Sequence, residues 1–95
     1  MTPPPRAARI EAETLALRAL TYVIGDAELG PRLLEVTGLD VATLRNRAGN
    51  PALLAATLAF LEAHEPSLLA CAASLDIPPQ ALLNARATLD PRSPE

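Results

Sequence analysis

Two side chains in this 95-residue chain could in principle act as a nucleophile and its base, namely the lone Cys71 and the lone His64. Covalent catalysis needs a nucleophile and a base within hydrogen-bond reach, and a structural metal site needs about four ligands. Cys71 lies among alanines in a predicted helix, where an apolar setting raises a thiol pKa and makes the group inert. His64 lies near the end of another predicted helix, without other metal-ligand residues at a suitable spacing. We therefore expect no catalytic residue, no cofactor and no metal site, and a protein that is not an enzyme.

Residues 68–89 have the spacing of a DNA-binding helix-turn-helix. Asp76 takes the turn position usually given to glycine, and aspartate can enter the left-handed backbone region. On the second helix, Gln80 and Asn84 could read base edges, and Arg86 is the nearby cation for a phosphate. A helical hairpin of this kind is also common in proteins that never contact DNA. An ordinary packed hairpin is therefore the preferred interpretation, and a DNA-binding regulator is the alternative.

The charge pattern argues against nucleic acid. The chain has a net charge of −3 and contains no lysine. Binding along a phosphate backbone requires clustered cations that displace counterions. Arg45 and Arg47, together with Arg32, could form a small basic patch, although a solvated surface of mixed charge is the more ordinary interpretation.

The stretch NPALLAATLAFL at residues 50–61 predicts the central helix of the fold. Asn50 is a good N-cap and Pro51 suits the first helical position. The following residues up to Leu61 carry no charge, so the helix should be covered on nearly all sides, with Phe60 and Leu61 buried. The run is too short to span about 30 Å of hydrocarbon.

The remaining pattern predicts an all-α, compact single-domain bundle of five to six short helices. Gly25, Gly38 and Gly49 mark helix ends, while Pro31 leaves the start of the second helix either distorted or separated as a short turn. The Pro-rich residues 1–8 and the end at 90–95 should be disordered tails around a domain at 9–89. The expected helices cover about residues 9–24, 26–37, 41–48, 51–64, 66–75 and 79–89.

The first helix has more apolar surface than one neighbour needs. Its polar residues form a single stripe at helical spacing, and Leu15 and Tyr22 belong to the wide apolar arc around that stripe. Exposed apolar patches usually mark protein contacts. We therefore take Leu15, Tyr22, Arg45 and Arg47 as the candidate interaction surface.

No segment has the length and apolar character of a membrane span, and the N-terminus lacks the apolar stretch of a secretory leader. A single cysteine cannot form an intramolecular disulfide, which suits a reducing compartment. We expect a cytoplasmic protein with no membrane association.

Several segments together resemble a known family: AETLALRAL with the following Gly25-Asp26 turn, LLEVTGLDVATLR at 33–45, NPALLAATLAFLEAHEPSLLACAASL at 50–75, and IPPQALLNAR at 77–86. This pattern is similar to a bacterial family of short proteins known as domain of unknown function 3572, from which Pro31 and Pro66 are local departures. The resemblance covers nearly the whole predicted domain and implies a small helical protein without a known activity. The positions that carry it are Leu17, Gly25, Asp26, Thr37, Gly38, Leu39, Leu44, Arg45, Leu58, Phe60, Leu61, Leu68 and Leu69.

The interpretation that fits these observations is a non-enzymatic protein-interaction or regulatory module. Its partner would be another protein or a second copy of the chain in a homodimer. The helix-turn-helix regulator at residues 68–89 is kept as the alternative, with nucleic acid the less favoured partner.

Overall fold

A computed structural model describes residues 5–90, and in this range the chain forms six α-helices and no strand. The expected all-α single-domain bundle is confirmed. The helices are α1 (Pro5–Gly25), α2 (Leu29–Thr37), α3 (Val41–Asn46), α4 (Pro51–Glu62), α5 (Glu65–Leu75) and α6 (Pro79–Leu89).

Side-chain caps fix the starts of the central helices where the sequence predicts them. The Asn50 side chain accepts hydrogen bonds from the backbone N–H groups of Ala52 at 2.8 Å and Leu53 at 3.4 Å. The Asp40 carboxylate accepts from the Thr43 N–H at 2.7 Å. Each cap satisfies donors that the first turn of a helix leaves unpaired, so the chain enters α3 and α4 at defined residues.

The start of α1 differs from the expectation. The helix begins at Pro5 instead of Arg9, because a proline at the first helical position loses no hydrogen bond that the helix would have made. Residues 1–4 and 91–95 lie outside the described part of the chain, so the prediction of disordered tails is not tested there. Within α2, Pro31 occupies the first turn, where its missing N–H costs nothing, and the helix starts only at Leu29.

The glycines end their helices in different ways. Gly38 follows α2 in the left-handed conformation, with φ of 72°, and its N–H donates to the Leu34 carbonyl at 2.8 Å. This is the expected helix stop. Gly25 and Gly49 do not have positive φ, so the prediction that they end their helices in the same way as Gly38 is wrong. The third helix ends at Asn46 instead of Ala48, and the chain continues through turns.

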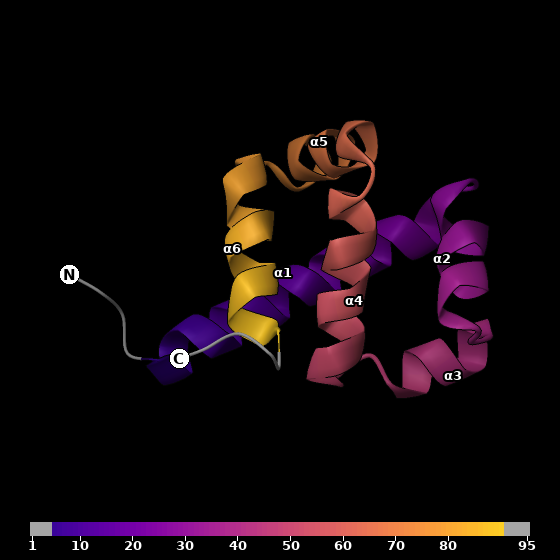
Figure 1. The fold of residues 1–95 in the computed structure, drawn as a ribbon, viewed down its shortest axis with the longest axis horizontal. Coiled ribbons are helices and arrows are strands. Elements are labelled where there is room, and N and C mark those ends of the chain that lie inside the picture. The colour runs from indigo at the N-terminus through magenta and orange to yellow at the C-terminus, as the bar shows by residue number, and fades with distance from the viewer. Residues whose placement is uncertain (1–4, 91–95) are drawn as a thin grey trace.

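The long helix α1 is the element against which most of the fold is built. It packs against α6, α4, α2 and α5, and α4 and α6 pack against each other. Figure 1 shows α1 running behind α4 and α6, with α5 joining the two and α2 and α3 following the far end of α1. The first and last helices of the chain are therefore neighbours in space.

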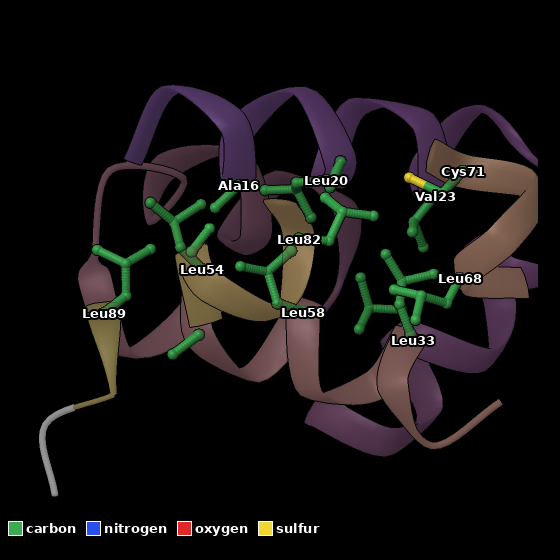
Figure 2. Close-up of a cluster of buried hydrophobic side chains, with 14 of the residues drawn as sticks. Ala16, Leu20, Val23, Leu33, Leu54, Leu58, Leu68, Cys71, Leu82 and Leu89 are labelled. Atoms are coloured by element: carbon green, nitrogen blue, oxygen red, sulfur yellow. The ribbon is translucent and has the colours of Figure 1, made fainter. Parts of the chain in front are cut away.

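The core lies between α1 and the pair formed by α4 and α6. Figure 2 shows Ala16, Leu20 and Val23 of α1 pointing toward leucines from several helices. The small side chains of Ala12, Ala16 and Ala19 let the partner helices approach α1 closely. The largest fully buried side chains are Val23, Leu33, Leu44, Leu54, Thr57, Leu58, Leu61, Cys71 and Leu82.

The central position of α4 is confirmed only in part. Leu61 is fully buried, but Phe60 is only half-buried, contrary to the expectation that both are enclosed. One face of α4 is open to solvent and consists of Ala52, Ala56 and Ala59, with the C-cap residue Ala63 exposed after them. The absence of charged residues from 51–61 does not require that α4 be fully enclosed. Alanine exposes little apolar area and strongly favours the helical state, so an alanine face can lie in solvent.

Candidate interaction surface

The surface turned away from the core on α1 is defined by Ile10, Thr14, Leu17 and Thr21, and we call these residues the outer face. All four are exposed, and with 3.6 residues per turn they lie on the side of the helix opposite to the core-facing alanines. Ile10 is 55% exposed and Leu17 is 44% exposed. These two belong to the few large apolar side chains that the described part of the chain leaves in solvent.

One of the two threonine hydroxyls on the outer face is hydrogen-bonded within the helix. The Thr21 hydroxyl donates to the Leu17 carbonyl at 3.0 Å. On the adjoining flank, the Arg18 guanidinium donates to the Leu75 carbonyl at the end of α5, at 3.2 Å. The Arg18 bond joins α1 to the hairpin formed by α5 and α6, and it holds the cation beside the outer face.

A shallow groove lies along this flank. Ile10, Glu11, Thr14, Leu15 and Arg18 line a volume of about 350 Å³. A second groove of about 340 Å³, between α1 and α6, shares Glu11 and Leu15. Leu15 is thus the apolar residue common to both grooves. Glu11 and Arg18, of opposite charge, lie on the same flank of the helix.

The structure brings together only half of the candidate surface predicted from the sequence. Leu15 and Tyr22 are both half-buried on the flank of α1. Burial, the nearby Asp26 carboxylate and the Cys71 thiolate all act to raise the pKa of Tyr22. Arg45 and Arg47 are exposed on and just after α3, and α3 makes no substantial packing contact with α1. The two arginines therefore do not extend this surface.

The helix-turn-helix alternative has the expected turn but not a free cation. Asp76 adopts the left-handed conformation, with φ of 58° and ψ of 46°, as the sequence predicted. Arg86 forms ion pairs with Glu62 on α4 and with Asp90, the latter at 3.2 Å. The Gln80 side chain donates to the Asn84 side chain at 3.0 Å. All three residues proposed to contact DNA thus already have partners inside the protein.

The two residues that could do covalent chemistry have separate, ordinary roles. Cys71 is fully buried, and burial raises the pKa of its thiol to about 11. His64 precedes α5 as its N-cap residue, and its ring Nδ1 lies 2.6 Å from the Ser67 hydroxyl. Residues 5–90 contain no cluster of three or more His, Cys, Asp or Glu residues suited to a metal ion. In the same range, no helix combines the length and apolar character needed to cross a membrane.

Sequence reasoning missed the outer face as a surface. It placed Thr14 and Thr21 on a polar stripe and Leu17 within the apolar arc, whereas these residues share one exposed side with Ile10. The available signal was the seven-residue separation of Ile10 and Leu17, with a threonine between them and another after them. Residues at this spacing lie on the same side of a helix over two turns.

The arrangement defines a small all-α bundle protein, built on one long helix with an apolar outer face. A family model described as "Protein of unknown function (DUF3572)" matches residues 9–92, and the chain belongs to this family. The resemblance expected from the sequence is thereby confirmed. Comparison with curated proteins gave no match. Comparison with solved structures also gave none.

Proposed function

We propose that this protein is a non-enzymatic interaction module and that it binds its partner through the outer face of α1. One observation carries the proposal: Ile10 and Leu17 are both about half exposed on one side of a helix whose opposite side is in the core. Apolar side chains that share one side of a helix form a surface that a second apolar surface can cover. The partner is a protein, no cofactor takes part, and the buried free Cys71 supports a cytoplasmic setting.

The other large apolar side chains exposed in the described part of the chain are less suited to form a binding surface than those on α1. Val36 on α2 is 71% exposed and Val41 on α3 is 41% exposed, but they sit on two short helices at a corner of the fold. Leu69 is 46% exposed on α5. None of these three has a second large exposed apolar residue two turns away on the same side of its helix. The outer face of α1 lies on the longest helix of the described chain.

The alternative function, a helix-turn-helix regulator, is less well supported. The left-handed Asp76 favours it, but Arg86 would have to leave two carboxylates before it could bind a phosphate. Breaking that pairing would leave Glu62 next to the DNA backbone without its counter-charge, which opposes binding. We therefore place protein contact ahead of DNA contact.

The proposal is tested with a photoreactive amino acid placed at Thr14 in the full chain and activated in living cells. The matched control carries the same group at Ala42, an exposed position on α3. We expect a discrete crosslinked product from position 14, absent from position 42 and lost when Leu17→Arg is added. If position 14 yields no more product than position 42, the outer face is not a binding surface.

A further inference from the structure

We infer that the occupant of the outer face is a second copy of this chain, with the two α1 helices antiparallel and Glu11 of each copy opposite Arg18 of the other. The inference rests on the proposed function and names its partner. Three observations support it: the spacing of the exposed residues, their alternating sizes, and the placement of the two charges.

The exposed residues of the outer face have the spacing of a two-helix seam. Ala7, Ile10, Thr14, Leu17 and Thr21 are all exposed, and they follow one another at alternating steps of three and four residues. Such alternation keeps side chains on the line along which two helices touch. The seam runs along most of α1, opposite to the core, so a second helix can lie on it without displacing any element of the fold.

Residue size fits an antiparallel partner. In one antiparallel register, Leu17 of each copy lies against Thr14 of the other, and Ile10 lies against Thr21. Large and small side chains then alternate across the seam, and such alternation gives close packing. In the next antiparallel register, Glu11 of the two copies would face each other, and this like-charge contact disfavours it.

The charges on the flank select the same register. Glu11 and Arg18 are both exposed and lie two turns apart on the same edge of the seam. In an antiparallel pair, equivalent edges of the two helices face each other in opposite directions. Glu11 therefore meets Arg18 of the other copy, twice, by symmetry. In a parallel pair, Arg18 would instead face Glu13, which is half-buried on the opposite edge.

The groove of about 350 Å³ borders the seam, because Ile10 and Thr14 line it together with Glu11 and Arg18. Leu15 lies roughly 130° around the helix from the seam and also lines the groove shared with α6, so pairing leaves it outside the contact. The interface is small, so the dimer should be weak, with a dissociation constant of roughly micromolar or above, as for interfaces below about 1,200 Å².

The test is sedimentation of the full chain over about 1 to 500 μM, a range that brackets a weak dimer of this size. We expect a concentration-dependent dimer for the natural sequence and a monomer for Leu17→Arg. Leu69→Arg is the matched control, because Leu69 is as exposed as Leu17 but lies on α5. It should dimerise normally. Circular dichroism melts establish that each variant is folded.

Charge reversal tests the orientation. We expect Glu11→Arg and Arg18→Glu each to weaken the dimer by at least about fivefold, about 1 kcal/mol per pair of sites. Combining both changes in one chain should restore association, because the two charges then exchange places. Loss of the dimer with Glu13→Arg but not with Glu11→Arg would overturn the antiparallel pairing.

A monomer at every concentration would overturn self-association as a whole. The cell crosslinking from Thr14 then separates the two proposals. A discrete product that contains a different protein, and that is lost with Leu17→Arg, would support the interaction surface and contradict the dimer. If position 14 gives no product, both the interaction surface and the dimer are contradicted.

Discussion

The Arg86 guanidinium on α6 is paired with the Glu62 carboxylate on α4, and its second nitrogen lies 3.2 Å from Asp90. This pairing joins two core helices at their edges. It also occupies the cation that a DNA-binding interpretation of α6 requires. The ion pair between Arg86 and Glu62 thus both stabilises the contact of α4 with α6 and disfavours DNA binding through α6.

The first prediction concerns the stability of this pair. Arg86→Ala should lower the free energy of unfolding by about 1 kcal/mol, since both side chains are about a third exposed and solvent weakens their attraction. Denaturant melts measure the change. A double-mutant cycle with Glu62→Gln should show coupling between the two sites. A cycle that is additive within error would mean that the ion pair contributes nothing measurable.

The second prediction is that the protein does not bind duplex DNA. Fluorescence titration with random duplex at low salt is the most permissive condition, because electrostatic binding is strongest there. We expect no saturation below about 10 μM protein, which lies within the usual nonspecific range, and no change with Arg86→Ala. A tighter, steeply salt-dependent complex that Arg86→Ala abolishes would favour the helix-turn-helix regulator instead.

The third prediction distinguishes two adjacent residues of α4. Leu61→Ala should lower the free energy of unfolding by about 2–5 kcal/mol, because Leu61 is fully buried and its loss leaves a cavity. Phe60→Ala should cost less than the usual 3–5 kcal/mol for a buried phenylalanine, since part of the ring is already exposed to solvent. Denaturant melts compare the two variants. A larger loss at Phe60 than at Leu61 would contradict the burial described above.

The fourth prediction concerns Cys71 at alkaline pH. Its folded pKa is raised from the ordinary 9.0 to about 11, so the unfolded chain loses the thiol proton first as the pH rises. The stabilising contribution is therefore complete below pH 9 and is lost between about pH 9 and pH 11. Melts of the natural chain should lose stability across this window more steeply than melts of Cys71→Ala. Equal slopes would show that the thiol does not contribute.

The same burial makes Cys71 slow to react with thiol reagents in the native state. Labelling at neutral pH should require opening of the fold, because the thiolate is the reactive form and the side chain is enclosed. Rapid labelling without denaturant would be incompatible with this position in the core.

The fifth prediction compares two glycines. Gly38→Ala should destabilise the protein by about 1 kcal/mol, because φ of 72° is strained for any residue with a Cβ. Gly49 has ordinary φ and open space around its Cα, so Gly49→Ala should be neutral or stabilising by up to about 1 kcal/mol. Thermal melts of both variants provide the comparison. Destabilisation by Gly49→Ala but not by Gly38→Ala would contradict the prediction.

The helices and their caps were predictable because they depend on local chemistry. Asn50, Asp40 and Asp76 act on groups within a few residues, and each does what its side chain and backbone preferences indicate. Glycine was less reliable as an end signal. Gly49 follows α3 without a left-handed stop, because a turn between Arg47 and Asn50 already redirects the chain.

The orientation of the helices was not predictable in the same way. On α4, an alanine is compatible with a core position and with a solvent position, so composition did not show that Ala52, Ala56 and Ala59 are exposed. On α1, Leu17 is apolar like its core-facing neighbours but lies on the other side. Which side of an apolar helix is covered depends on where the remaining helices pack, and this is set by contacts between residues distant in sequence.

The packing of α1 against α6 also determines when the protein can complete its core during synthesis. The first helix leaves the ribosome early, but its most extensive partner is the last helix of the fold. At roughly 5–20 residues per second, α1 waits for seconds before α6 is available. Throughout that interval the part of its core-facing side that α6 covers is open to solvent, together with the outer face that carries Ile10 and Leu17, so the nascent chain is more vulnerable to misassociation before α6 emerges.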